Sequence, residues 1–267
     1  MCSSDLFLCV CCLTEPANAK DFKYSYGVFI GAEPEDISAA DDYETIVIDA
    51  AFFSKAQIKE LKNEGHIVYS YLNIGSIETW RSYYKKYKPY TLGIYENWED
   101  ERWVDISKKK WQKFVVDTLA GKLSTKGIDG FFIDNADIYW YHHKNSIYNG
   151  LNKILKKLKK KYRLTIMVNG GDTYIKKCIR SGRKLYFDAV NQESVFSRIT
   201  DYKKDTFGVQ KAEELKYYKS YLKKCKKAGL NIYLLEYTKD QSLALKAERY
   251  CDKMGYGLYI SDSIKLN

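Results

Sequence analysis

Short apolar runs alternate along this chain with segments whose apolar residues recur every three to four positions. Eight of the runs are rich in β-branched and aromatic residues, and most are largely hydrophobic, which is typical of parallel strands covered by helices. They lie at Tyr26–Ile30, Thr45–Phe53, His66–Ile74, Gly130–Asp134, Thr165–Asn169, Ala189–Glu193, Asn231–Tyr237 and Tyr256–Ser261. Eight strands with helices between them predict an α/β fold, a single (β/α)8 TIM barrel.

The segments between these runs have helical periodicity. Leu151, Ile154, Leu155 and Leu158 follow an i, i+3, i+4, i+7 pattern, and Trp111 begins a similar one. Glycines precede several strands by one to three residues, where a left-handed residue ends a helix; they are Gly65, Gly127, Gly229 and Gly255. No G-x-G-x-x-G motif follows the first strand, which removes the main signal of an open dinucleotide-binding sheet.

Two connections are longer than the others, and both follow the carboxyl end of a strand. One runs from Gly75 to Asp105 after the third strand, and the other from Ala136 to Tyr148 after the fourth. Barrels place their functional residues on this face. Both extended loops are rich in tyrosine and tryptophan, including Tyr139 and Trp140. Such side chains can stack on the C–H faces of sugar rings, or can simply pack the loop onto the barrel.

The start of the chain adds an export signal to this picture. An apolar run over residues 6–13 is followed by Ala17-Asn18-Ala19, a small-x-small cleavage pattern. We interpret residues 1–19 as a signal peptide and residues 20–267 as the barrel domain, so the protein is expected to be secreted or at the cell surface. No positive residue precedes the apolar run. A buried N-terminal segment and a lipid-anchored start are the alternatives.

The net charge of the chain indicates which kinds of partner it can bind. The net charge is +10 at pH 7, and it rises to +12 without the leader, whose charged residues are Asp5 and Glu15. Most lysines cluster on predicted helices, which indicates a solvated outer face that can also adhere to an anionic cell surface. No nucleic-acid-binding module accompanies the charge, and we expect no nucleic acid partner. We expect the protein to act as a monomer.

Neither the cysteines nor the histidines predict a disulfide framework or a metal site. Four of the seven cysteines lie in the leader, and we interpret Cys178, Cys225 and Cys251 as small core residues. His142 and His143 are adjacent and have no third partner in the pattern, so we expect no metal and no cofactor.

Carboxylates close several of the predicted strands, and these strand ends meet at one mouth in a barrel. Asp134 ends the fourth strand and Glu193 the sixth, which have the same parity and can face one another across the pocket. The second strand carries Asp49, and Glu236 lies at the end of the seventh. Two opposed carboxylates suit glycoside hydrolysis, where one protonates the leaving oxygen and the other attacks the anomeric carbon or activates water.

Three motifs at these positions resemble a known family. They are Tyr71-Leu72-Asn73-Ile74-Gly75-Ser76-Ile77-Glu78-Thr79-Trp80-Arg81, Gly127-Ile128-Asp129-Gly130-Phe131-Phe132-Ile133-Asp134-Asn135 and Asn191-Gln192-Glu193. Over about residues 24–262 the chain resembles glycoside hydrolase family 114, the endo-α-1,4-polygalactosaminidase-like barrels. The resemblance implies cleavage of a galactosamine-containing polysaccharide, with Asp134 as nucleophile and Glu193 as acid/base.

The resemblance also implies that Asp49, Asn73 and Asn135 shape the sugar site. Further substrate-binding candidates at the same mouth are Asp137, Tyr139, Trp140, Asn169 and Glu236. Asp137 has a structural alternative, because it can cap the segment that begins near Ile138. Glu78 and Arg81 are expected to pair with each other and brace their loop, a helical turn apart if it coils.

Two points stay open at the level of sequence. A strongly basic chain should repel a polycationic galactosamine polymer unless its groove is acidic, whereas a neutral or N-acetylated polymer would meet less resistance. The alternative to an enzyme is a non-catalytic carbohydrate-binding barrel at the cell surface. Such a protein would need only the aromatic loops and the basic exterior.

Overall fold

Eight parallel strands form the central sheet of the protein. The computed structural model describes residues 20–267, so the predicted signal peptide lies outside the described residues. The strand order is β1-β2-β3-β7-β8-β9-β12-β13. The strands are β1 Tyr24–Phe29, β2 Tyr43–Ile48, β3 Ile67–Asn73, β7 Gly130–Asp134, β8 Thr165–Asn169, β9 Ala189–Glu193, β12 Asn231–Tyr237 and β13 Gly257–Ser261. The predicted (β/α)8 barrel is confirmed, and β7, β8, β9 and β12 have the predicted bounds.

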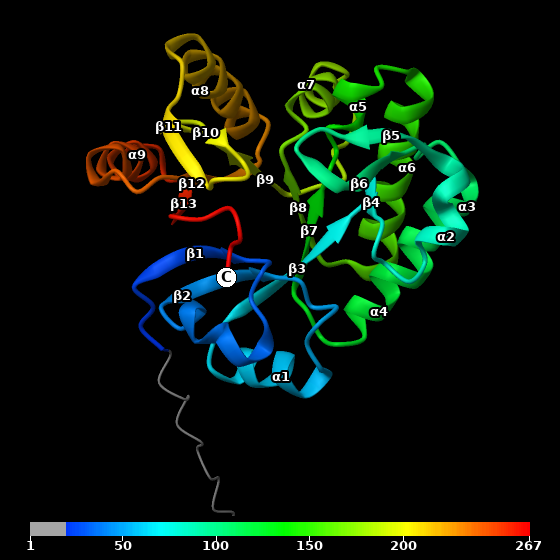
Figure 1. Ribbon diagram of the computed structural model, residues 1–267, viewed down its shortest axis with the longest axis horizontal. Coiled ribbons are helices and arrows are strands. Elements are labelled where there is room, and N and C mark those ends of the chain that lie inside the picture. Colours follow the sequence, from blue (N-terminus) through cyan, green and yellow to red (C-terminus); the bar gives the residue numbers. More distant parts are fainter. Residues whose placement is uncertain (1–19) are drawn as a thin grey trace, which may run out of the picture.

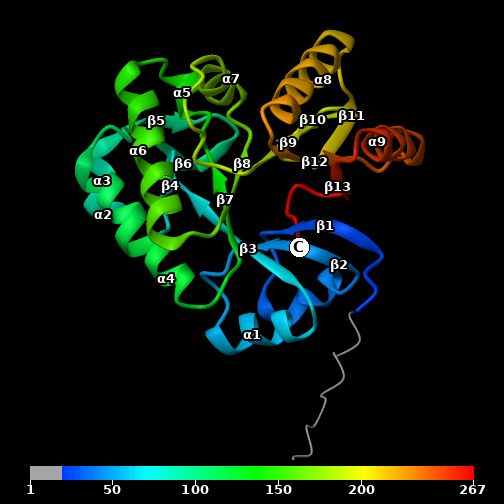
Figure 2. The same cartoon turned by 180° about the vertical axis from the view of Figure 1, so that it is seen from behind.

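Helices connect the strands and surround them on the outside (Figures 1 and 2). They are η1 Pro34–Ala40, α1 Lys55–Asn63, α2 Tyr84–Tyr87, η2 Lys88–Tyr90, α3 Lys109–Lys113, η3 Phe114–Leu119, α4 Ala120–Ser124, α5 Ile138–Tyr141, α6 Asn145–Tyr162, α7 Asp172–Arg180, α8 Ala212–Lys227 and α9 Gln241–Met254. The predicted apolar stripe of α6 is fully buried against the sheet. The four glycines expected at helix ends all have positive φ, so they do reverse the chain there.

The two ends of the sheet meet where β13 lies beside β1, close to the C-terminus (Figure 1). Within residues 20–267 no backbone ladder joins these strands. Instead, the rings of Phe29 and Tyr259 lie 5.2 Å apart, and Gly31 N donates to Leu266 O at 2.9 Å. Tyr26 fills the interior against Tyr233, with their ring centroids 4.6 Å apart. The barrel is therefore a packed core, which leaves its mouth for ligands.

Two small antiparallel sheets extend the carboxyl end of the barrel. β4 Ser76–Glu78, β5 Thr91–Tyr95 and β6 Trp98–Val104 form one sheet after β3, and β10 Ser197–Asp201 pairs with β11 Thr206–Val209 after β9. The first predicted loop thus contains a three-stranded sheet together with α2 and η2, and much of the second is α5 and the first turn of α6. The hairpin after β9 was not predicted.

The predicted second strand is too long at its carboxyl end. β2 ends at Ile48 because the chain turns at Asp49, whose Oδ1 accepts a hydrogen bond from Ala51 N at 3.0 Å. Cys178, Cys225 and Cys251 are buried free thiols, in agreement with their interpretation as core residues. Across residues 20–267, no helix has both the length and the apolar character to cross a membrane.

Candidate active site

Asp134 at the end of β7 and Glu193 at the end of β9 are linked through the strand between them. The side-chain amide of Asn169, at the end of β8, donates to Asp134 Oδ1 at 3.0 Å and to Glu193 Oε1 at 2.7 Å. β7, β8 and β9 are adjacent and parallel, so their carboxyl ends meet at the mouth. Both carboxylates are only partly buried, which leaves them open to a ligand.

A chain of hydrogen bonds fixes the orientation of the Asn169 amide. Asn191 Nδ2 donates to Asn169 Oδ1 at 2.7 Å, and the hydroxyl of Tyr26 donates to Asn191 Oδ1 at 3.1 Å. Because the carbonyl oxygen of Asn169 is occupied, its NH2 group must face the two carboxylates. This chain of hydrogen bonds therefore runs from Tyr26 in the barrel interior to the carboxylate pair.

The two carboxylates differ in their remaining partners. Asp134 also accepts hydrogen bonds from the backbone of Asn135 and the hydroxyl of Tyr71, whereas Glu193 accepts one from the Tyr237 hydroxyl at 3.1 Å. Burial raises the pKa of both groups, these donors lower it, and the charge of Asp134 raises the pKa of Glu193 further. Asp134 has more hydrogen-bond donors than Glu193, so its ionised form is the better stabilised of the two.

A third carboxylate, Glu101 from β6, reaches the same mouth. Its Oε2 accepts from Ser76 Oγ at 2.6 Å and from Asn135 Nδ2 at 3.4 Å. The amides of Asn73 and Asn135 also contact Ser76 Oγ, at 2.7 and 2.8 Å. Burial raises the pKa of Glu101 to about 7, and the charge of Asp134 adds to the shift. The two asparagines thus hold Ser76 and Glu101 beside the carboxylate pair.

Glu101 is not among the predicted site residues, because the pattern predicts a loop after the third strand. Residues 98–104 contain four consecutive charged side chains, so they lack the alternation of a half-buried strand. Asn97 before them has a φ of 68°, which is typical of a hairpin turn, but the residue type alone is a weak signal. Tyr71 and Tyr237 were missed as well, because a tyrosine within an apolar strand has the same pattern as a core residue.

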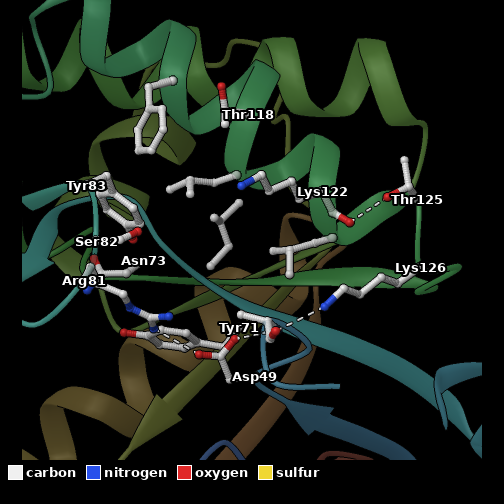
Figure 3. A pocket seen from close by; sticks show the side chains of 15 residues that line it. Asp49, Tyr71, Asn73, Arg81, Ser82, Tyr83, Thr118, Lys122, Thr125 and Lys126 are labelled. Carbon is white, nitrogen blue, oxygen red and sulfur yellow. Dashed lines mark hydrogen bonds and ion pairs between the residues drawn. The ribbon is translucent and has the colours of Figure 1, made fainter. Parts of the chain in front are cut away.

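Asp49 and Glu78 hold Arg81 between them at the edge of the mouth. Arg81 Nη2 lies 3.0 Å from Asp49 Oδ2 and 3.1 Å from Glu78 Oε1. The expected Glu78–Arg81 pair is present, although Glu78 lies on β4 and not on a helical loop. Figure 3 shows Arg81, Asp49 and Tyr71 at one end of a cavity of ≈ 530 Å³ that extends toward Lys122 on α4. Asp49 and Glu78 therefore offset the positive charge of Arg81 where this cavity meets the mouth.

A groove of ≈ 540 Å³ shares Asp49, Tyr71 and Arg81 with that cavity. Aromatic rings and carboxylates line most of it: Phe52, Trp80, Trp98, Glu78, Glu99, Asp100 and Glu101. Its other basic residue, Lys203, lies 3.1 Å from Glu99. The groove is therefore acidic although the whole chain is basic.

Three further candidates lie near the turn between β8 and α7 or on α5. Both oxygens of Asp137 accept from Gly171 N, at 3.1 and 3.0 Å, and burial raises the pKa of Asp137 to about 7. Its side chain makes no cap at α5, so the capping alternative for the segment near Ile138 is wrong. Tyr139 is buried, and its hydroxyl accepts from Lys177 Nζ at 2.7 Å. Trp140 is 67% exposed and can contact a ligand.

Glu236, at the carboxyl end of β12, is engaged by the backbone. Its carboxylate accepts hydrogen bonds from the backbone N–H groups of Val195, Phe196 and Ser197 at 2.8 to 3.1 Å, and from Ser197 Oγ at 2.6 Å. Glu236 is 1% exposed. Glu236 thus fixes the connection that follows Glu193.

A (β/α)8 barrel with carboxylates gathered at the carboxyl ends of its strands is an architecture of glycoside hydrolases. The model of the glycoside-hydrolase family GH114 matches residues 12–261 of this chain. The protein belongs to family GH114 and is a glycosidase.

Solved structures share the fold at low sequence identity. The glycoside hydrolase domain of PelA from Pseudomonas aeruginosa matches with a TM-score of 0.76 and 17% identity over 91% of this chain and 95% of that one. Ega3 from Aspergillus fumigatus, solved in complex with galactosamine, matches with a TM-score of 0.72 and 18% identity over 94% and 98%. No curated protein sequence matches the chain. These likenesses show the fold, and the family model shows the family.

Proposed function

We propose that the protein is an endo-acting glycosidase that cleaves an α-1,4-linked, galactosamine-containing polysaccharide through Asp134 and Glu193. The observation that carries this proposal is the Asn169 amide, which hydrogen-bonds both carboxylates at once. Membership of family GH114 supports the reaction class. The likeness to Ega3, which was solved with galactosamine, supports the sugar.

The spacing of the two carboxylates favours a retaining mechanism. Inverting pairs are held roughly 6.5 to 9.5 Å apart, to leave room for a water molecule, and retaining pairs about 5 to 5.5 Å apart. Asn169 Nδ2 lies 3.0 Å from Asp134 Oδ1 and 2.7 Å from Glu193 Oε1. Even if the three atoms lay on one line, these two oxygens would be closer together than the inverting range. We therefore assign them the roles of a retaining pair.

In this mechanism, Glu193 donates its proton to the glycosidic oxygen while Asp134 attacks the anomeric carbon. The bond to the leaving sugar breaks, and an ester forms between the carboxylate of Asp134 and the remaining sugar. Glu193, now ionised, takes a proton from water, which then attacks the anomeric carbon and releases Asp134. The hydrogen bonds from Tyr71, Asn135 and Asn169 stabilise the anion of Asp134 before attack and after release.

The acidic groove supports a cationic substrate despite the basic exterior. Its carboxylates would attract the ammonium groups of a deacetylated polymer, and the local field there outweighs distant lysines at physiological ionic strength. Glu101 would lose its proton more readily as an ammonium group approached, which would strengthen the contact. The exposed rings of Trp80 and Trp98 are available to stack on sugar faces and on their ammonium groups.

The export pattern of residues 1–19 supports action on a polymer outside the cytoplasm. The lysine-rich outer helices support a peripheral association of the monomer with an anionic cell surface. Asp49, Asn73, Asn135, Asp137, Tyr139, Trp140, Asn169 and Glu236 remain our candidates for shaping the sugar site. Of these, Asn169 and Glu236 are assigned to hold protein groups in place, because their polar atoms are occupied by the protein.

The test is product release from partly deacetylated galactosamine polymers, glucosamine polymers and neutral galactans. We expect the wild-type protein to cut a galactosamine polymer with retention of the α configuration, which NMR of the first products detects. Asp134→Asn and Glu193→Gln should each lower kcat by roughly 10³-fold, because each removes one of the two reacting groups. Glu213→Gln, an exposed carboxylate on α8, is the matched control and should keep full activity.

Two outcomes would contradict the proposal. An active enzyme that keeps its rate in either active-site variant would exclude the assigned carboxylate pair. A wild-type protein that cuts none of the polymers but binds one as tightly as both variants do would instead support the non-catalytic carbohydrate-binding barrel.

A further inference from the structure

Three side chains of metal-ligating type meet at the end of the barrel opposite the carboxylate pair. Asp41 lies just before β2, Glu64 is the C-cap of α1, and His66 lies just before β3. One ligand atom from each lies within 4.8 Å of the other two. Asp41 and Glu64 are exposed, whereas His66 is 3% exposed. The cluster therefore joins one buried nitrogen to two accessible carboxylates.

The hydrogen bond at one ring nitrogen of His66 defines what the other can do. Nδ1 lies 2.7 Å from the backbone oxygen of Tyr43, and a carbonyl oxygen only accepts, so Nδ1 carries a proton. In the neutral ring, Nε2 then presents a lone pair. This nitrogen is buried, has no hydrogen-bond partner within residues 20–267, and lies 3.8 Å from Glu64 Oε2. A carboxylate has no proton to offer it, whereas a cation would satisfy both groups.

The surroundings match those of protein metal sites. A ligating histidine usually donates its second ring nitrogen to a carbonyl or carboxylate, as His66 does to Tyr43, and this fixes the ring. Phe22 covers the imidazole, with the ring centroids 4.9 Å apart. Ligands bound tetrahedrally to zinc are about 3.4 Å apart. Small rotations of the exposed Asp41 and Glu64 side chains would bring the three atoms to that spacing.

We propose that Asp41, Glu64 and His66 bind one Zn²⁺ ion, with water completing its coordination. Imidazole and carboxylate together suit zinc, whereas Ca²⁺ and Mg²⁺ prefer oxygen ligands alone. The ion would tie the segment before β2 to the turn between α1 and β3. Because this is the amino end of the strands, the site serves stability and not hydrolysis. The proposal is independent of the proposed function.

The experiment compares the full chain with the variant Asp41→Asn/Glu64→Gln after removal of metal by EDTA. Asp42→Asn/Glu60→Gln is the matched control, because it removes two exposed carboxylates next to the cluster. In calorimetric titration with ZnCl₂, the cluster variant should bind one equivalent less than the wild type and the control. Saturating zinc should raise Tm by about 5 °C in these two proteins and not in the cluster variant. CaCl₂ and MgCl₂ should have no such effect.

The comparison between variants is needed because the N-terminal cysteines and the pair His142–His143 are present in all three proteins and can also bind zinc. X-ray absorption of the wild type should show the histidine nitrogen that the cluster supplies. Equal zinc stoichiometry in the wild type and the cluster variant overturns the proposal. The proposal is also overturned if the Tm of the cluster variant lies below that of the wild type by the same amount with and without zinc. The carboxylates would then stabilise the protein through ion pairs with His66 and not through a bound metal.

Discussion

Glu193 ends β9 and Glu236 is the last residue but one of the neighbouring strand β12, yet the protein holds their carboxylates in opposite ways. Glu193 accepts hydrogen bonds from the side chains of Asn169 and Tyr237, and it is partly open to solvent. Glu236 accepts from three successive backbone N–H groups and is almost fully buried. The sequence pattern of the two strand ends is similar. What separates a carboxylate available for chemistry from one that builds the framework is the nature of its donors.

The two carboxylates are also connected through the chain. The residues whose N–H groups Glu236 accepts, 195–197, follow Glu193 almost directly, and Ser194 between them has a φ of 55°. A non-glycine residue adopts this left-handed conformation only when its surroundings impose it. Glu236 therefore contributes to the position of Glu193 without facing the groove itself.

Among the residues that support the two carboxylates, the largest effect is expected at the side chain that both share. Asn169→Ala removes the donor that stabilises the anion of Asp134 and positions Glu193 beside it, so kcat should fall by roughly 10²-fold. Steady-state kinetics on the polymer that the wild type cuts measure this. Gln192→Ala is the control, because Gln192 is equally buried but bonds only the backbone of Glu193. Equal losses in the two variants would show a general disturbance of the strand ends.

The proximity of Asp134 and Glu193 could be predicted from sequence because parallel strands all end at one mouth. Asp134 and Glu193 each close an apolar run, and the periodicity of the runs defines the barrel. The roles of their neighbours could not be predicted in the same way. Asn169 also closes a strand, but only the order of β7, β8 and β9 places its amide between the two carboxylates. That order is a tertiary fact, with no local signal in the chain.

Contacts between loops that follow different strands could not be predicted from the hydrophobic pattern. Glu101 enters the mouth on a hairpin where the sequence pattern predicts a loop, and the cluster of His66 with Asp41 and Glu64 joins residues from two turns. Spacing along the chain gives no information on such contacts, because two connections meet only after the strands between them are paired.

Glu236→Gln tests the framework side of the comparison. The new amide nitrogen must face a backbone N–H, so a buried donor loses its acceptor, and unfolding should become easier by about 2 kcal/mol. Burial raises the pKa of Glu236 to about 7 from a usual value of 4.5. The folded wild type thus keeps a proton that the unfolded chain has lost, and its stability should fall as pH rises from about 4.5 through 7.

Thermal unfolding of the wild type and Glu236→Gln between pH 5 and pH 8 measures both effects. The variant should have a lower Tm at pH 5 and a flatter dependence on pH, because glutamine does not titrate. Activity per folded molecule should fall much less than in Asn169→Ala. A variant with full stability and a large loss of kcat would place Glu236 among the groups that contact the sugar.

The smallest effect is expected at Tyr237, which donates to Glu193 Oε2. This bond stabilises the ionised form of Glu193, so Tyr237→Phe should raise the pKa of that carboxyl. If Glu193 is the general acid, the alkaline limb of kcat/KM moves to higher pH, and the maximal rate falls less than about tenfold. Tyr221→Phe is the control, because it removes a buried hydroxyl without a partner within residues 20–267. A lower rate with an unchanged alkaline limb would mean that Tyr237 contacts the sugar and that its hydrogen bond does not determine the pKa of Glu193.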